Sequence, residues 1–284
     1  MFQSLENHIA YDIGKRSIAP LRVPGDLQQA TKALFTANRV GILTGFYVLR
    51  AGTGETDGPP GAIALARGLA KLGKYPVIFT DAPNLPLLRA GLDTVAPDIP
   101  LVEYPFENTD VFVTHQLDKG FDHLVAIERA GVARDGNYYS MRGESITAYT
   151  APMDCLIITA RSRGIRTTGI GDGGNEIGMG KRFGLVQAYI PHGETIASTT
   201  TTDFLITCGV SNWGTWALLA GLSVLSGESV MPEPHVEHDV LQALIRAGAV
   251  DGITGIPKML IDGFPLAVHL QMLESIRHIM EINQ

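Results

Sequence analysis

The residues best suited to chemistry lie in a glycine-rich stretch that runs from Thr167 to Lys181. Two carboxylates, Asp172 and Glu176, and the amide of Asn175 lie there among six glycines. Glycine lets the backbone adopt positive φ and approach a ligand closely, and carboxylate and amide oxygens accept hydrogen bonds or bind hard cations. The stretch is therefore predicted to form the floor of an active site. The alternative is a glycine-rich turn with solvated acids, because the G-x-G-x-x-G spacing within it is weak evidence by itself.

A second polar loop, residues 51–61, precedes a segment of helical spacing at 62–73. Asp57 or Gly58 can cap the start of that helix. The free N–H groups and the dipole of a helix N-terminus attract anions. This loop, which includes Thr56, is thus a predicted seat for a carboxylate or phosphate, with an ordinary aspartate cap as an equal alternative.

A third group of polar residues follows the apolar run 123–129, which ends in Glu128 and Arg129. The loop 134–143 comes next and concentrates aromatic, basic and amide side chains. Such a density of specific side chains in a loop is typical of a binding site, although tyrosines packed on the edge of a sheet would give the same composition.

Short apolar runs alternate with helical patterns along the chain. The runs that predict strands are 40–46, 76–81, 101–104, 123–129, 166–170, 185–190 and 204–209. The main segments that predict helices are 4–11, 26–38, 62–73, 84–91, 109–119, 152–162, 211–225, 237–247 and 265–281. This alternation predicts a single α/β domain over 26–284, with a mostly parallel, Rossmann-like sheet and helices on both faces, after an N-terminal arm over 1–25.

Right-handed crossovers bring the carboxyl ends of parallel strands to one edge of a sheet. The loops after the first, fourth and glycine-rich strands are therefore expected to meet there. The charged residues expected to converge are Glu55, Asp57, Glu128, Arg129, Asp172 and Glu176. The order of the strands does not follow from the sequence.

The composition narrows the functional class. The formal net charge is −7, which argues against a nucleic-acid partner. No apolar stretch reaches the 18 residues typical of a membrane helix, and the first 16 residues lack the apolar run of a signal peptide. Cys155 and Cys208 lie in apolar surroundings and are predicted to be reduced core thiols. We therefore predict a cytoplasmic, globular protein without a membrane partner, either monomeric or a homo-oligomer.

Three motifs, taken in order, resemble those of the D-glutamate cyclase family, and more narrowly of its C-terminal domain. These motifs are residues 56–62, residues 127–129 with 135–143, and residues 171–180. The resemblance covers roughly 26–280, and Ala130 stands where members of the family often carry proline. The vertebrate member joins this domain to a hydratase-like domain. The resemblance therefore implies a separate hydratase-like protein as a possible partner of this chain.

The resemblance implies a hydro-lyase of D-amino acid metabolism that cyclises D-glutamate to 5-oxo-D-proline with loss of water. A base must deprotonate the substrate amine before it attacks the γ-carboxylate. Positive charge or a metal ion must then take up the developing negative charge. A folded substrate conformation must also be enforced. No nicotinamide or flavin is expected, whereas Mn²⁺ or Mg²⁺ is a possible cofactor.

Each chemical task implied by the resemblance has candidate residues. Asp172 and Glu176 are expected to form the Mn²⁺ or Mg²⁺ site, or otherwise to act as bases, with Glu128 or Asp57 as the alternative base. Arg142 or Arg129 is expected to hold a carboxylate, together with the helix N-terminus after Asp57. The other expected substrate contacts are Thr56, Gly58, Asn137, Tyr139, Gly171, Gly173 and Asn175.

Two other functional classes compete with this interpretation. Residues 171–176 also look like the Mg²⁺-binding loop of haloacid-dehalogenase-type phosphohydrolases, with Glu176 in the final acidic position. Those enzymes need an upstream Asp-x-Asp nucleophile motif, and the nearest candidate, residues 80–83, contains only Asp81. The second competitor is a non-catalytic metabolite- or nucleotide-binding domain that needs a partner.

Overall fold

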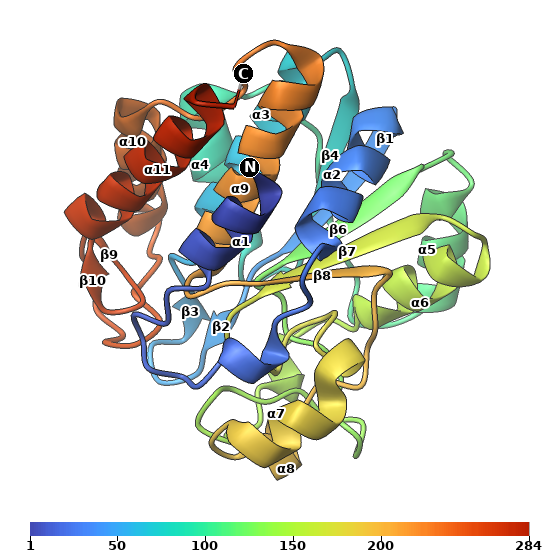
Figure 1. Ribbon diagram of the computed structural model, residues 1–284. Helices are drawn as coiled ribbons and strands as arrows, with labels where there is room; N and C mark the ends of the chain where they lie inside the picture. The colour runs from blue at the N-terminus through green and yellow to red at the C-terminus, as the bar shows by residue number, and fades with distance from the viewer. Residues whose placement is uncertain (284) are drawn as a thin grey trace.

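The computed structural model describes residues 1–283, and a six-stranded sheet runs through the centre of this part of the chain (Figure 1). Every neighbouring pair in the sheet is parallel. In spatial order the strands are β5 (Leu101–Glu103), β4 (Tyr75–Thr80), β1 (Arg39–Thr44), β6 (His123–Ile127), β7 (Arg166–Gly171) and β8 (Phe204–Thr207). The predicted α/β fold with a mostly parallel sheet is confirmed.

The strand order reverses between β1 and β6. From β1 the chain proceeds outward through β4 to β5, and it then returns to the other side of β1 and continues through β6, β7 and β8. Connections that leave β1 and β6 therefore diverge and open a crevice beyond the carboxyl ends of these strands. In open α/β sheets this switch point is where ligands bind.

Side chains of the strands alternate between two apolar layers, as the period of two requires. Val40 and Ile42 of β1 belong to the larger core, whereas Leu43 belongs to the core on the opposite face. The helices of the larger layer are α1 (Phe2–Ile9), α2 (Asp26–Thr36), α3 (Pro59–Lys71), α4 (Leu85–Val95), α9 (Ser211–Ser226), α10 (Pro234–Arg246) and α11 (Leu266–Glu281). The opposite face carries α5 (Thr109–Leu117) and α6 (Asp154–Ser162).

Helix α9 is the central helix of the larger layer. Every residue from Ser211 to Ser223 is buried, and α9 packs against α1, α2, α3 and α11 as well as against the sheet. A helix that is apolar on all sides needs such surroundings. Its N-terminus is thereby fixed at the crevice beside β1 and β6.

The predicted strand at 185–190 is wrong. This segment lies in helix α7 (Phe183–Tyr189), which packs with the short helix α8 (Gly193–Ile196) in a lobe below the sheet in Figure 1. Phe183, Val186 and Ile190 contribute to one small core, at helical spacing. Short apolar runs do not distinguish a strand from a helix by periodicity alone.

The first 25 residues pack closely on the rest of the chain. Leu5 and Ile9 of α1 are buried in the main core. The chain then passes below α1 and through a 3₁₀ turn at Ala19–Leu21 before it enters α2 (Figure 1). The predicted arm therefore lies against the domain along this path, and its middle part reaches the crevice.

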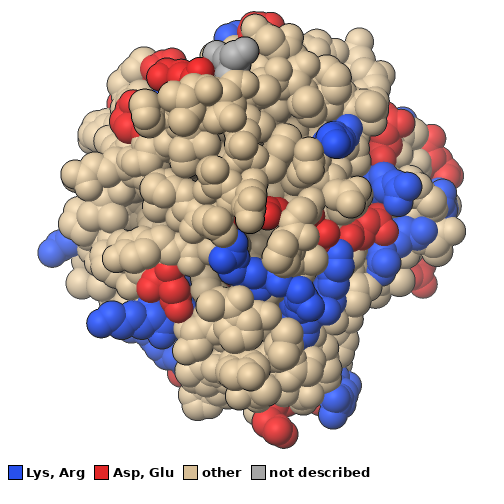
Figure 2. All heavy atoms as spheres, in the orientation of Figure 1, with Lys and Arg blue, Asp and Glu red and all other residues tan. Residues whose placement is uncertain are grey.

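Charged side chains are unevenly placed on the surface. In Figure 2 the basic side chains form a band between the main body and the lower lobe, and large areas of the same face carry no charge. Much of the acidity that gives the chain its net charge of −7 does not appear on this face. A part of it is buried in the crevice.

Candidate active site

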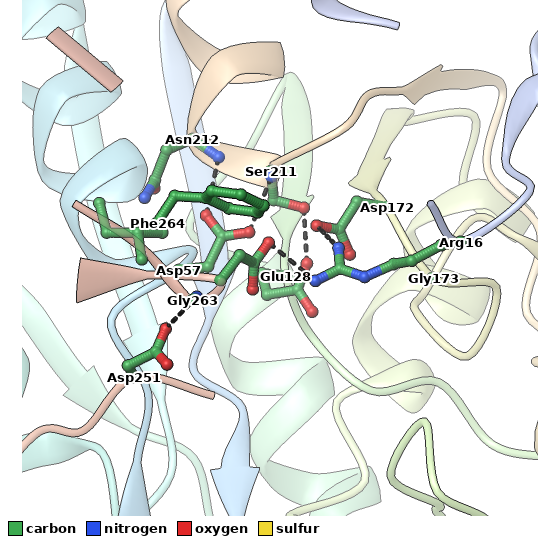
Figure 3. A network of polar contacts seen from close by, with 12 residues as sticks. Arg16, Asp57, Glu128, Asp172, Gly173, Ser211, Asn212, Asp251, Gly263 and Phe264 are labelled. Atoms are coloured by element: carbon green, nitrogen blue, oxygen red, sulfur yellow. Dashed lines mark hydrogen bonds and ion pairs between the residues drawn. The ribbon is translucent and has the colours of Figure 1, made fainter. Parts of the chain in front are cut away.

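Three acidic side chains from the three predicted loops meet in the crevice. Asp57 follows β1, Glu128 follows β6 directly and Asp172 follows β7 directly. One carboxylate oxygen of each lies within 4.8 Å of one oxygen of the other two, and all three residues are buried. Figure 3 shows them pointing toward one another from separate elements. We call Asp57, Glu128 and Asp172 the acidic triad.

The backbone at Glu128 is strained. Its φ is +41°, in the left-handed region that residues with a side chain rarely occupy. Its carboxylate accepts a hydrogen bond of 2.6 Å from the hydroxyl of Ser211 at the start of α9. Gly58, with φ +92°, makes room for this arrangement, because a Cβ there would lie 2.6 Å from the Cβ of Glu128. Strain held in this way is a frequent property of functional sites.

Asp57 holds its place through a pair of helix caps that are exchanged between α3 and α9. Its two carboxylate oxygens accept the backbone N–H groups of Ser211 and Asn212, at 2.8 and 2.9 Å. In return, the side-chain oxygen of Asn212 accepts the N–H groups of Gly58 and Gly61 at the start of α3. Gly58, one of the two predicted cap residues, is the N-cap of α3, and the side-chain caps run from each helix to the other. The N-terminus of α3 is already satisfied and is not an open anion site.

Glu176 shapes the glycine-rich loop and does not join the triad. One of its carboxylate oxygens accepts the N–H groups of Asp172 and Gly173, and the other accepts that of Gly174 at 2.6 Å. Only 1% of the residue is exposed. Asp172 therefore occupies the predicted position in the site, whereas Glu176 fixes the backbone that carries it.

Two residues of the site were not predicted from the sequence. Arg16, in the N-terminal arm, forms ion pairs with Asp172 and with Asp262, the latter at 3.0 Å. Asp262 lies in the tight turn between β9 (Leu260–Ile261) and β10 (Phe264–Pro265). An Asp-Gly pair between apolar residues is a hairpin signal, and it could have located this turn. No local pattern indicates that residue 16 reaches it.

The acids line a small cavity of about 100 Å³ that opens to solvent. Glu55, Glu128, Asp172 and Asp262 contribute to its wall, together with Arg16. Drug-sized ligands need pockets of roughly 300–1,000 Å³. The cavity therefore suits a small metabolite, of the size of an amino acid.

Two exposed arginines, Arg50 and Arg142, also line the cavity. Both donate hydrogen bonds to the backbone carbonyl of Ile253, Arg142 at 3.1 Å. A neutral carbonyl is a weak partner for a cation compared with a carboxylate. These two side chains are therefore available to an anionic ligand.

Sequence comparisons identify relatives of this chain. A family profile described as "D-glutamate cyclase-like, C-terminal" matches residues 5–277. The chain belongs to this family. It is also similar to the human protein named D-glutamate cyclase, mitochondrial, with 35% identity over 313 aligned residues. The alignment covers 96% of this chain and 51% of the human protein, so the chain spans about half the length of that relative.

The predicted resemblance to the D-glutamate cyclase family is thus confirmed, and the match begins within the N-terminal arm. Among residues 1–283, no helix combines the length and apolar character needed to cross a membrane. The human relative is, by its name, a mitochondrial protein. The cytoplasmic location of this chain stays a prediction.

Several predicted contact residues of this D-glutamate cyclase-like domain stabilise the structure around the cavity. Arg129 is 1% exposed and forms an ion pair of 2.5 Å with Asp81. Thr56 donates to the carbonyl of Leu260 and so anchors the β9–β10 hairpin. Asn175 donates to the carbonyl of Tyr139 at 2.8 Å.

The predicted contact residues in the loop 134–143 and the glycines of the glycine-rich stretch contact neighbouring protein groups. Asn137 and the hydroxyl of Tyr139 both bond to Asp135. A Cβ at Gly171 would lie 2.9 Å from the carboxyl carbon of Glu176, and one at Gly173 would lie 2.5 Å from the sulfur of Met141. Of the two arginines expected to hold a carboxylate, only Arg142 lines the cavity.

Burial raises the pKa of four acidic groups at the site, which are Glu55, Asp57, Glu128 and Asp172. It raises the pKa values of Glu55 and Glu128 well above the usual range, and neighbouring carboxylates raise them further. Burial also raises the pKa of Asp172, although Arg16 opposes the shift. The pKa of Asp57 rises to about 8, mainly through burial and the charge of Asp262. These groups are therefore stronger bases than ordinary carboxylates, and Asp57 exchanges its proton near neutral pH.

Arg16 stays charged among these groups. Burial lowers its pKa, but Asp172, Asp262 and Glu128 raise it further, so that the pKa lies above its ordinary value. Including Glu55 and Asp57, five buried carboxyl groups thus surround a single guanidinium.

The acidic triad could hold a metal ion. Its donors are all carboxylate oxygens, which suit hard divalent cations such as Mg²⁺ and Mn²⁺. The repulsion between carboxylates that helps to raise the pKa values of Glu55, Glu128 and Asp172 would be relieved by a divalent cation. Of the two residues predicted to bind the cation, Asp172 belongs to this group with Asp57 and Glu128, whereas Glu176 does not.

The raised carboxyl pKa values make the metal-free protein less stable in alkali. A folded-state pKa above the unfolded value contributes stability below the unfolded pKa and loses it as the pH rises through the folded pKa. For Asp57 the interval runs from its ordinary value of 3.8 to about 8. In EDTA, the Tm is expected to fall between pH 5 and pH 9.

The control for this experiment is the same titration with Asp57→Asn, which should flatten part of the slope. Glu237 of α10, whose pKa is also raised to about 8 by burial, contributes in the same direction. The comparison therefore uses Glu237→Gln as the background for both proteins. A Tm that increases over this pH range would contradict the expected titration.

Proposed function

We propose that this domain cyclises D-glutamate to 5-oxo-D-proline with loss of water. The observation that carries the proposal is one small cavity in which Glu128 and Asp172, with raised pKa values, lie together with Arg142. Such a cavity matches a substrate that has one ammonium group and two carboxylates. Membership of the D-glutamate cyclase-like family supports the same reaction.

Glu128 is the proposed general base. It faces the cavity, and its raised pKa makes it a stronger base toward an ammonium group than an ordinary glutamate. The amine nitrogen then forms a bond to the carbonyl carbon of the γ-carboxylate, Cδ, and the bond from Cδ to one carboxylate oxygen breaks. The nitrogen loses two protons over the whole reaction, and the departing oxygen takes up two protons and leaves as water. Glu128 carries protons from the nitrogen to this oxygen.

Other residues of the cavity bind and orient the substrate. Arg142 is the proposed partner of the α-carboxylate, because its present partner is the neutral carbonyl of Ile253. Asp172 is the proposed partner of the substrate ammonium. It is paired with Arg16 of the N-terminal arm, and the glycine-rich loop fixes its position. A Mn²⁺ or Mg²⁺ ion held by the acidic triad would polarise the γ-carboxylate as a Lewis acid.

A phosphohydrolase of the haloacid-dehalogenase type is less compatible with the site. Asp81, the nearest candidate for its nucleophile, is fully buried and paired with Arg129 and Asn84. The alternative of a binding domain that needs a partner has a specific basis, because the chain spans about half the human relative. A hydratase-like protein or a second copy of this chain is the partner that this alternative requires.

A proton NMR time course tests the proposal. The purified protein is incubated with D-glutamate or L-glutamate, each with Mn²⁺, Mg²⁺ or EDTA. We expect 5-oxoproline signals from the D-isomer only. Loss of turnover in EDTA would support the metal site. A folded protein that yields no product in any mixture would exclude cyclase activity of this chain alone and favour the partner-dependent binding domain.

A further inference from the structure

Arg16 occupies an unusual position for a residue of an N-terminal arm. Its guanidinium lies inside the crevice between Asp172 and Asp262, as Figure 3 shows for the pair with Asp172. Its side chain is 13% exposed and lines the cavity. Arg16 therefore reaches the same space as Glu128 and can touch a ligand there.

The arm is folded so that it directs this side chain inward. Lys15 and Ser17, the two neighbours of Arg16, have φ values of +53° and +65°. Left-handed backbone is unfavourable for residues that carry a side chain. The carboxylate of Asp12 stabilises the turn, because it accepts the N–H groups of Arg16 and Ser17, both at 2.8 Å. A turn of this cost is maintained only where the rest of the structure compensates for it.

The guanidinium has donors left for a ligand. An arginine side chain carries five N–H donors, and the contacts with Asp172 and Asp262 involve one terminal nitrogen each. Those two carboxylates hold the plane of the group, so little conformational freedom is lost when a ligand binds. A carboxylate in the cavity can accept the remaining donors.

The positions of the base and of the two arginines indicate which carboxylate of D-glutamate binds to Arg16. The reacting γ-carboxylate must lie within bond-forming distance of the amine, and the amine must lie beside its base, Glu128. Arg16 lines the same small cavity as Glu128 and Asp172, which places the guanidinium near the reacting atoms. The exposed Arg142 is left for the α-carboxylate.

We propose that Arg16 is a catalytic residue that binds the γ-carboxylate of the substrate and stabilises the negative charge that develops on its oxygen. This proposal rests on the proposed function and adds to it a residue from the N-terminal arm. The guanidinium donates hydrogen bonds throughout and neither gains nor loses a proton. The role does not depend on a metal ion.

Substrate binding without turnover tests the proposal. In the Glu128→Gln background, D-glutamate and D-norvaline are titrated by calorimetry in EDTA. D-norvaline has a methyl group in place of the γ-carboxylate. We expect at least tenfold tighter binding of D-glutamate. Adding Arg16→Met should bring the two affinities to within about threefold, and Arg16→Lys should retain an intermediate preference.

Arg22→Met is the matched control. It removes the same charge from the same arm, but Arg22 bonds to Asn7 and does not line the cavity. We expect it to keep the full preference for D-glutamate. The proposal is overturned if the preference survives Arg16→Met in a protein that melts cooperatively, or if the Glu128→Gln background shows no preference at all.

The kinetics separate the two proposals. If the wild type cyclises D-glutamate, Arg16→Met should lower kcat/KM by about 10²–10³-fold, as loss of one donor to a developing oxyanion does. A wild-type kcat in this variant would overturn the role of Arg16. If the wild type does not turn over D-glutamate but the binding preference still depends on Arg16, the cyclase proposal fails and the carboxylate site at Arg16 stands.

Discussion

Glu128→Gln is expected to lower kcat for D-glutamate by about 10²–10⁴-fold, the contribution typical of a positioned general base. Glutamine keeps the size of the side chain and can still accept the hydrogen bond from Ser211, but it cannot take a proton from the substrate amine. The protein should remain folded, because glutamine fills the same space and keeps the bond with Ser211. Steady-state kinetics and a thermal melt of the same preparation measure both effects.

The matched control is Glu237→Gln. Glu237 is also buried and has a raised pKa, but it lies in α10, outside the cavity. The control should therefore keep the wild-type kcat. Wild-type turnover by Glu128→Gln would remove Glu128 from the mechanism and leave Asp172 as the base.

The pH profile gives a second view of the same group. Because the pKa of Glu128 is raised well above its usual range by burial, the base is still protonated at pH values where an ordinary glutamate is ionised. We therefore expect kcat/KM to rise with pH through the raised pKa. In Glu128→Gln this limb of the profile should disappear from the residual activity.

The acidic triad could be predicted from sequence because of where its members lie along the chain. Asp57, Glu128 and Asp172 each follow a strand of the parallel sheet, and parallel strands end at one edge. That reasoning needs only the alternation of strands and helices. It does not give the strand order, so it could not show that β1, β6 and β7 are neighbours.

The same reasoning failed where the role of a side chain depends on tertiary partners. Glu176 and Asp172 are both acids of the same glycine-rich loop, and nothing in the sequence distinguishes their roles. In the folded loop, backbone N–H groups donate hydrogen bonds to both carboxylate oxygens of Glu176. Arg16 and Asp262 form an ion pair although they lie near opposite ends of the sequence. Their pairing depends on how the arm and the last hairpin pack, which no local pattern encodes.

Arg129 is the clearest example of a charged residue at a strand end whose role is structural. It directly follows Glu128, yet its side chain points to the carbonyls of Gly45 and Ala151 and to Asp81. We expect Arg129→Met to destabilise the protein by about 3–5 kcal/mol, the usual cost of leaving one partner of a buried ion pair alone. Urea unfolding measures this loss.

Two comparisons separate a structural Arg129 from one that binds substrate. Adding Asp81→Asn to Arg129→Met removes the stranded charge and should recover part of the lost stability, since the cost comes from the buried carboxylate and not from the missing cation. Arg142→Met should behave in the opposite way, with a raised KM and nearly unchanged unfolding, because Arg142 is exposed and lines the cavity. If Arg129→Met instead kept the stability of the wild type and raised KM, Arg129 would be a substrate ligand. The cavity would then have to be larger than the structure shows, because Arg129 does not line it.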